Sequence, residues 1–250
     1  MKKLINTIFL ILSILSLKAA PADSLQRANQ LYDANEYAKA IQLYENIVNK
    51  GNESAALYFN LGNSYYKNGE ITKAILNYER AKLLAPNDDD ITFNLELTNQ
   101  FVVDKIEPLP KPFFVKWFEN SIAWFTSDQW ATISITAFIL ALALGLTYLF
   151  SRNLTFRKLS FTFSIVLLAL TLGTFIMASK QKSRLTNRNH GIIFNPTVTV
   201  KSSPSESGTD LFVIHEGLKV QLIDSLSNWI EIRLEDGNTG WVQNNVLEII

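Results

Sequence analysis

Three hydrophobic patterns divide the chain. Predominantly apolar runs without a charged residue occupy residues 4–17, 131–150 and 161–179. In residues 23–106 the apolar positions recur every three or four residues, as in amphipathic helices, whereas beyond Gly191 short alternating runs bounded by Gly, Pro and Asp predict strands. We therefore predict a multidomain membrane protein with an all-α region, two transmembrane helices and a small all-β barrel.

The first apolar run is typical of a signal peptide. Lys2 and Lys3 precede it, and it is shorter than the roughly 20 residues that span a bilayer. Ala20-Pro21-Ala22 has the small residues that signal peptidase requires. We predict a signal peptide over residues 1–22, with an uncleaved anchor as the alternative. In both cases the segment that follows is exported.

The two central runs are predicted to form a membrane hairpin. Residues 131–150 and 161–179 carry no charge and are each long enough to cross roughly 30 Å of hydrocarbon. The loop between them, 151–160, contains three basic residues and is expected in the cytoplasm. Buried helices of a soluble protein are the alternative. Small residues repeat every four positions and are expected to pack the two helices together or against another subunit, unless their spacing is accidental: Ala137, Ala141 and Gly145 on the first helix, Ala169 and Gly173 on the second.

An exported amino-terminal region followed by two spans places both soluble regions outside the cytoplasm. This predicts a bacterial inner-membrane protein with both soluble domains in the periplasm. Seven basic residues and no acidic ones occupy residues 151–190, and four of the seven follow the second span. Those four argue for the opposite orientation, but a long carboxy-terminal domain can be translocated despite flanking charge.

Residues 23–106 contain an internal repeat. Ala40 and Ala74, and likewise Tyr44 and Tyr78, lie 34 positions apart. The second copy, 55–88, has small Gly62 where two helices cross, and it ends at a proline, which cannot continue a helix. This pattern resembles the tetratricopeptide repeat (TPR). The first copy, about 23–52, matches less well, and residues 89–105 are predicted to form a capping helix.

TPR arrays bind peptides along a concave face formed by the first helix of each repeat. The resemblance assigns that face the residues Asn29, Tyr32, Phe59, Asn63, Tyr66 and Lys67. An asparagine at the position of Asn29 and Asn63 commonly bonds a ligand backbone or carboxylate in this family. Solvated polar residues on a helix face are the alternative.

A proline-rich stem and an aromatic helix are predicted over residues 107–130. Three prolines between Ile106 and Pro112 favour a stiff extended linker. The aromatic residues that follow recur at helical spacing, which suggests a helix lying in the membrane interface. Packing of this helix against the repeat domain is the alternative.

Residues 190–250 are predicted to form the β-domain. Five runs read as strands: 197–200, 211–215, 219–223, 229–234 and 240–242. Turns are expected at Ser203-Pro204, Glu216-Gly217 and Asp236-Gly237. The pattern resembles the bacterial SH3-like domain, in which Trp229 and Trp241 are signature aromatics. These two side chains are expected in the core or, alternatively, on a ligand-binding surface.

Composition limits the chemistry. Hydrophobic residues make up 48% of the chain and charged residues 18%, less than the roughly 25% typical of soluble domains. The chain has no cysteine and only two histidines, which excludes thiolate and multi-histidine metal sites. We find no phosphate-binding loop and no nucleophile elbow. The sequence therefore predicts a protein that is not an enzyme, with no catalytic residues, metal or cofactor, and no nucleic-acid partner.

The order of these segments, with the stem Asp104-Lys105-Ile106-Glu107-Pro108-Leu109-Pro110, resembles the BatE-type proteins of the Bat aerotolerance operon. The resemblance implies an envelope assembly with von Willebrand-type Bat partners and a role in aerotolerance or stress. The leading hypothesis is a non-enzymatic scaffold that presents both modules to protein partners. The alternative is an anchored protein that binds peptidoglycan.

Overall fold

The computed structural model describes residues 20–250, so the predicted signal peptide lies almost entirely outside the described residues. The described chain forms two compact units. The first combines the residues up to Leu109 with Asn189–Ile250, and the second is Pro110–Arg188. The first unit thus joins the repeat domain and the β-domain, which the sequence analysis treated as separate modules.

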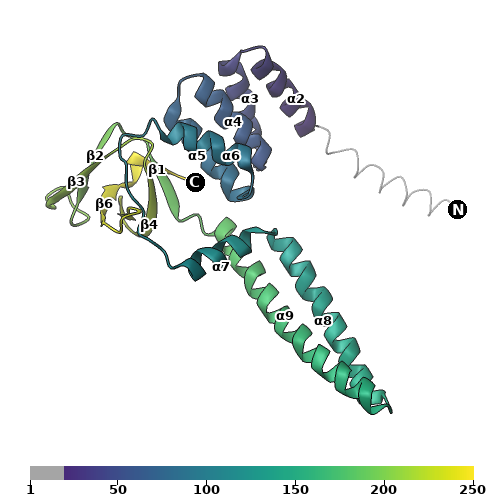
Figure 1. Cartoon of the computed structure of the whole chain (residues 1–250). Coiled ribbons are helices and arrows are strands. Elements are labelled where there is room, and N and C mark those ends of the chain that lie inside the picture. Colours follow the sequence, from purple (N-terminus) through teal and green to yellow (C-terminus); the bar gives the residue numbers. More distant parts are fainter. Residues whose placement is uncertain (1–19) are drawn as a thin grey trace, which may run out of the picture. The chain divides into compact units, whose positions relative to one another are not determined.

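Five helices build the repeat domain (Figure 1): α2 (Ala20–Asp33), α3 (Tyr37–Asn49), α4 (Ala55–Lys67), α5 (Ile71–Leu84) and α6 (Asp89–Asn99). Gly62 allows α4 and α5 to cross closely, because a Cβ there would lie 2.7 Å from the ring of Tyr78. Ser54 caps α4 through its side chain, and Gly69 adopts a positive φ of 84° in the turn before α5. The second predicted repeat is therefore a helical hairpin with a small-to-large contact at its centre.

The predicted capping helix is shorter than expected. It begins at Asp89, with the Asp88 side chain accepting from two backbone amides, but it ends at Asn99 rather than at 105. The ammonium group of Lys105 folds back to the carbonyl oxygens of Asn99 and Gln100, at 2.9 and 3.1 Å. These bonds satisfy carbonyl groups that are left free where a helix ends.

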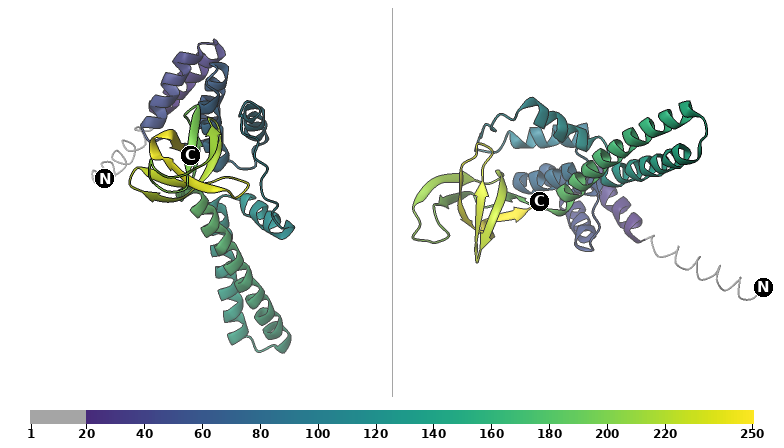
Figure 2. Two further views of the ribbon diagram at one scale, coloured as in Figure 1. Left: turned by 90° about the vertical axis from the view of Figure 1, so that its left-hand side faces the viewer. Right: turned by 90° about the horizontal axis from the view of Figure 1, so that it is seen from below.

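Seven strands form the β-domain: β1 (His190–Ile193), β2 (Thr197–Lys201), β3 (Asp210–His215), β4 (Lys219–Leu226), β5 (Trp229–Arg233), β6 (Thr239–Gln243) and β7 (Leu247–Ile249). A short 3-10 turn, Asn244–Val246, precedes the last strand. The sheet is antiparallel with the order β3-β2-β6-β5-β4-β1-β7. The two further views show how strongly it curls (Figure 2). Strands β1 and β7 were not among the five predicted strand segments.

The predicted barrel is not closed by hydrogen bonding within the described residues. Strands β3 and β7 are the two edges of the sheet. The turns lie where the sequence predicted them, and Gly217 and Gly237 adopt φ values of 84° and 94° there. Gly240 provides a close approach, since a Cβ there would lie 2.4 Å from Val200. The observed architecture is a curled antiparallel sheet.

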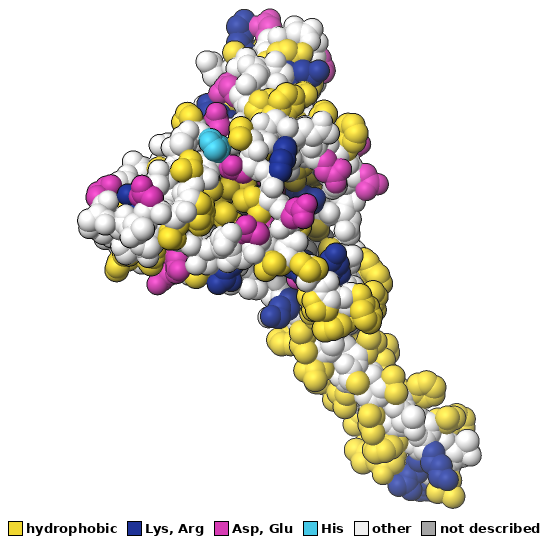
Figure 3. All heavy atoms as spheres, turned by 60° about the vertical axis from the view of Figure 1, so that its left-hand side comes forward, with side chains coloured by type: hydrophobic (Ala, Val, Ile, Leu, Met, Phe, Trp, Pro, Cys, Tyr) yellow, Lys and Arg dark blue, Asp and Glu magenta, His cyan; other side chains and the backbone are white. Residues whose placement is uncertain are grey.

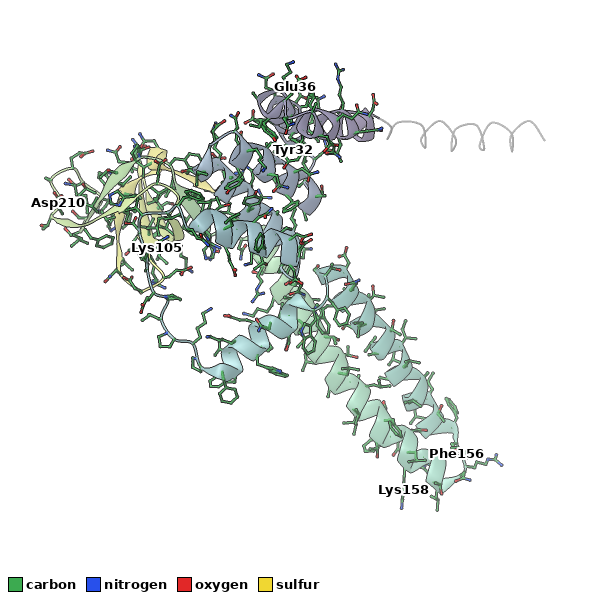
Figure 4. The ribbon with its side chains drawn as sticks, turned by 45° about the horizontal axis from the view of Figure 1, so that its top comes forward. Tyr32, Glu36, Lys105, Phe156, Lys158 and Asp210 are labelled. Carbon is green, nitrogen blue, oxygen red and sulfur yellow. The ribbon has the colours of Figure 1, made fainter. Side chains whose placement is uncertain are left out.

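The stem is not a free linker at its start. Asp104 accepts hydrogen bonds from the backbone amide of His215 at 2.6 Å, and its other oxygen lies 2.9 Å from the His215 ring. Leu109 donates its amide to the carbonyl of Glu235 at 3.0 Å, and Ile106 packs against the core. Lys105 marks this segment beside the strands (Figure 4). The first half of the predicted stem is therefore part of the β-domain surface.

One hydrophobic cluster extends through both the repeat domain and the β-domain. It contains Ile75 and Val102 from the helical side together with Ile192, Ile193 and Leu218 from the sheet side. Gly217 lies directly on this contact, because a Cβ there would come within 3.0 Å of Val102 and 3.3 Å of Ile75. Arg80 adds a hydrogen bond to the carbonyl of Ile249 at 2.8 Å. The two domains are thus packed as one body.

The second unit contains α7 (Phe113–Ala123), α8 (Ser127–Phe150) and α9 (Leu154–Thr186). Thr126 and Gln129 form a capping box at the start of α8. Helices α8 and α9 are long and apolar enough to cross a membrane, and only 17% and 11% of their apolar windows are buried. Hydrophobic side chains cover this hairpin along its length (Figure 3).

The loop of the hairpin is much shorter than predicted. Helix α8 continues to Phe150 and α9 begins at Leu154, which leaves residues 151–153 in place of 151–160. The Asn153 side chain caps α9 by accepting from the amides of Thr155 and Phe156. No proline lies within residues 154–186 to interrupt the helix. Phe156 and Lys158 consequently lie in the first turns of α9, at the tip of the hairpin (Figure 4).

Small and hydroxyl-bearing residues line the contact between α8 and α9. Ala137 and Ala141 are buried, as predicted, and Ser164 donates to the carbonyl of Ala141 at 2.9 Å. Ser134 makes the equivalent bond to the carbonyl of Thr171 at 3.0 Å. On α9, Ala169 and Gly173 are exposed and do not pack against α8, so only their packing against another subunit stays a prediction. The buried positions of α9 are Ser160, Thr174, Ala178 and Gln181.

Of the aromatic residues in α7 and around the start of α8, only Trp130 is buried. Trp130 is buried, donates its indole N–H to the carbonyl of Ile122 at 3.0 Å, and packs edge-on against Phe125. Trp130 is therefore a packing residue of this unit. The exposed large side chains are Phe113, Phe114, Trp117, Phe118, Trp124 and Phe125.

Candidate peptide-binding face

The concave-face residues are organised around two equivalent hydrogen-bonded groups. In the first, Asn29 Oδ1 accepts from Tyr44 Oη at 2.6 Å and from Asn60 Nδ2 at 3.2 Å. In the second, Asn63 Oδ1 accepts from Tyr78 Oη at 2.7 Å and from Asn94 Nδ2 at 2.9 Å. Each residue of the second group lies 34 positions after its counterpart in the first. The repeat is therefore present in the hydrogen bonding as well as in the packing.

These bonds fix the orientation of the two key amides. Because Oδ1 of Asn29 and Asn63 is occupied by two donors, the Nδ2 group is turned away from the pair. Within the described residues, neither Nδ2 donates to another protein group. Burial raises the pKa of Tyr44 to about 12, with a further contribution from Asp33, so its hydroxyl stays a donor at physiological pH. Each triad thus holds one N–H group ready for a ligand acceptor.

A cavity of about 240 Å³ lies at the second triad; we call it the inner cavity. Its lining includes Tyr32, Asn63, Tyr66, Lys67, Asn94 and Leu97. Four of the six residues predicted for the concave face therefore line one cavity. Asn29 lies in the other triad, and Phe59 packs on the ring of Tyr78 with centroids 6.0 Å apart. Phe59 is therefore half-buried in the helical packing and does not line the inner cavity.

Sequence reasoning missed Asn94 and Leu97. Both were detectable by extending the 34-residue spacing into α6, because Asn94 follows Asn60 by one repeat and Leu97 follows Asn63 by one repeat. The predicted helix over residues 89–105, which corresponds to α6, was interpreted only as a cap. In the structure it supplies the far wall of the inner cavity.

The two tryptophans of the β-domain lie on the outer face of the sheet. On β5, Ile232 is fully buried, and Trp229 points to the opposite face. On β6, Val242 is buried, so Trp241 likewise points outward, directly opposite Glu231. Both tryptophans are half-buried. Neither tryptophan therefore belongs to the fully buried core of the domain, and a role of either in ligand binding stays a prediction.

The described residues show no arrangement suited to metal binding. Within residues 20–250, no three His, Asp or Glu side chains gather closely enough to hold an ion. Asp88, Asp89 and Asp90 begin α6, where Asp88 acts as the cap.

The comparisons with protein families identify two modules. Residues 55–88 match the model of the tetratricopeptide repeat, and residues 196–248 match that of the bacterial SH3 domain. No curated protein matches the chain. The TPR match covers α4 and α5, which carry Asn63 and Tyr78, and the SH3 match covers β2 to β6 with both tryptophans. Asn29 and Tyr44 of the first triad, on α2 and α3, lie outside the matched residues but repeat the hydrogen bond between Asn63 and Tyr78 within them.

Proposed function

We propose that this protein is a non-enzymatic, membrane-anchored adaptor whose TPR face binds segments of other envelope proteins. The observation that carries the proposal is the repeated Asn–Tyr–Asn group, which presents the Nδ2 of Asn29 and of Asn63 at equivalent places. Amide donors at a fixed spacing suit the carbonyl groups of an extended chain, and Lys67 adds a positive charge for a carboxylate. TPR and bacterial SH3 domains both favour binding to protein partners or to peptidoglycan.

The anchor in this proposal is the α8–α9 hairpin. Large apolar side chains are exposed along both of its helices, whereas Arg152, Arg157 and Lys158 lie at its tip. Two spans return the chain to its starting side, and the shared core of the TPR and SH3 domains requires that both lie on that side. With the basic tip in the cytoplasm, both domains lie in the periplasm.

The TPR face is tested with Asn63→Asp. Aspartate retains an oxygen for Tyr78 and Asn94 but replaces the N–H donor with a negatively charged acceptor, so the fold is kept while ligand binding is lost. Asn46→Asp, on the exposed side of α3, makes the same charge change outside the face. After cross-linking in native membranes, the wild type and Asn46→Asp should co-purify the same envelope proteins, and Asn63→Asp should lose them. Equal recovery by all three would contradict the proposal.

The orientation is tested by labelling, since the chain has no cysteine of its own. Single cysteines at Gln42, Ser207 and Arg152 report on the TPR domain, the SH3 domain and the hairpin tip. In spheroplasts an impermeant maleimide should label the first two and reach the third only after permeabilisation. Labelling of the tip in intact spheroplasts would overturn the proposed topology.

Peptidoglycan binding is the second candidate, and it is favoured by the outward placement of Trp229 and Trp241. Half-exposed aromatic rings are suited to stacking on sugar rings or on peptide stems. The detergent-solubilised chain should then sediment with purified sacculi, and Trp241→Ala should reduce sedimentation while Trp117→Ala, in α7, should not. A chain that stays in solution contradicts this candidate.

The resemblance to BatE-type proteins extends the proposal to von Willebrand-type Bat partners and to stress tolerance. Its support is the order of the modules along the chain. Proteins of that type among those co-purified by the wild type and lost by Asn63→Asp would support this extension.

A further inference from the structure

A second cavity, of about 410 Å³, lies where the TPR and SH3 domains meet; we call it the junction cavity. Its apolar lining combines Ile71, Ile75, Phe101 and Val102 from the helical side with Phe194 from the SH3 side. Thr72 and Glu216 face each other across the domain boundary, with Thr72 Oγ1 donating to Glu216 Oε2 at 3.1 Å. Both domains therefore build this cavity, and neither family match accounts for it.

The polar groups at this cavity are already paired. Lys73 lies 2.6 Å from Glu70, and this contact lowers the pKa of the Glu70 carboxyl, against the opposing effect of burial and with a further lowering by the hydrogen bond from Asn68. Glu216 accepts the bond from Thr72. Because the charges nearest the apolar floor have partners, the cavity is suited to an uncharged apolar group.

A ring contact connects the junction cavity with the inner cavity. Tyr66 lines the inner cavity, Phe101 lines the junction cavity, and their ring centroids lie 6.3 Å apart. Phe101 is 59% exposed although it is a large apolar residue on a packed domain. An exposed aromatic ring between two cavities indicates a continuous contact surface.

We propose that the two cavities form one binding path, in which a peptide held by Asn63 in the inner cavity places a large apolar side chain in the junction cavity. The SH3 domain then completes the peptide site of the TPR domain through Phe194 and Glu216. This inference rests on the proposed function, because the ligand reaches the junction cavity from the TPR face. It adds the chemistry of the ligand, namely a large apolar residue at a fixed distance from the segment bound by Asn63.

The test uses the full chain in nanodiscs and peptides selected on it from a randomised twelve-residue display library. Glu216→Trp fills the junction cavity from its exposed edge. Thr72→Val is the matched control, because it removes the same Thr72–Glu216 bond without filling the space. Phe101→Ala removes the ring that connects the two cavities. Because the Phe101 side chain is exposed, its loss should not unfold the domain, so a lower affinity would report on the ligand contact.

The inference predicts that selected peptides share a large apolar residue and that changing this residue to serine weakens binding at least tenfold in the wild type and in Thr72→Val. In Glu216→Trp the same change should have no further effect, and Phe101→Ala should bind the original peptide at least tenfold more weakly. An apolar residue that matters equally in the wild type and in Glu216→Trp overturns the junction site alone. Failure to select any peptide, or selected peptides insensitive to Asn63→Asp, overturns the proposed TPR function as well.

Discussion

Lys219 of β4 donates a hydrogen bond from Nζ to Oε2 of Glu79 on α5 at 2.6 Å, across the boundary between the two domains. Only 10% of the Glu79 side chain is exposed. A buried carboxylate needs a partner because desolvation of an unpaired charge is costly. Together with the apolar contact beside it, this ion pair therefore fixes the position of the SH3 domain on the TPR domain.

Replacing Lys219 with methionine should destabilise the first unit. The change leaves the Glu79 carboxylate buried without its cation, and we expect the free energy of unfolding to fall by about 2 kcal/mol. This loss is smaller than for a fully buried pair because the Lys219 side chain is about one-third exposed. Lys201→Met is the control, since its partner Asp210 is 67% exposed and the loss should stay under about 1 kcal/mol. Urea unfolding of the solubilised chain measures both, and equal losses would contradict the assigned role of Glu79.

Gly62→Ala should destabilise the TPR domain. The added methyl would lie 2.7 Å from two ring atoms of Tyr78, whose hydroxyl is fixed by Asn63, so the ring cannot move away freely. Overpacking of this kind costs about 1–3 kcal/mol. Gly145→Ala, in α8, meets its nearest neighbour at 3.8 Å and should leave stability nearly unchanged. Hydrogen exchange should show faster opening of α4 and α5 in Gly62→Ala only.

The sequence predicted the elements whose signals are local. The 34-residue spacing located α4 and α5, and the Gly217 and Gly237 turns are at the predicted places because positive φ values favour glycine. The placement of the tryptophans stayed open in the sequence because alternation along a strand defines two faces without saying which one is buried. In the structure, the buried face is the one that carries Ile232 and Val242.

The contact between the domains had no local signal. Residues Glu79 and Lys219 are 140 positions apart, and a hairpin intervenes between them in the chain. Ile75 and Val102 fit the helical pattern whether a sheet covers them or not. The same limit explains Ala169 and Gly173, because small residues at helical spacing do not show which face meets the neighbouring helix. The loop between α8 and α9 is only three residues long because Asn153 caps α9, and the sequence prediction had placed Asn153 within a longer basic loop.

Acidification should weaken the first unit through His190. Burial lowers the pKa of this histidine, and the charge of Lys219 lowers it further against a smaller opposite effect of Glu79. The unfolded chain therefore binds a proton more readily than the folded chain. Stability is full above the unfolded value of about 6.5 and falls as the pH drops from there towards the lower folded-state pKa.

His190→Gln should remove this contribution and flatten the dependence of the unfolding midpoint on pH between about 7 and 5. Urea unfolding at a series of pH values measures the slope. An unchanged slope would show that His190 does not contribute to the acid sensitivity of the fold.

Replacing either of two alanines by leucine should change the packing of the hairpin differently, although both alanines lie in similar apolar sequence. Ala141 is 1% exposed between α8 and α9, whereas Ala169 is exposed on α9. Ala141→Leu should separate the helices and break the bond from Ser164 to the Ala141 carbonyl, because close approach requires small residues. Ala169→Leu adds the same volume on the open side and should leave the pair unchanged. Spin labels on cysteines at Ile135 and Leu170 should report a longer and broader distance for Ala141→Leu only. A longer distance in Ala169→Leu would show that the exposed face of α9 also contacts α8.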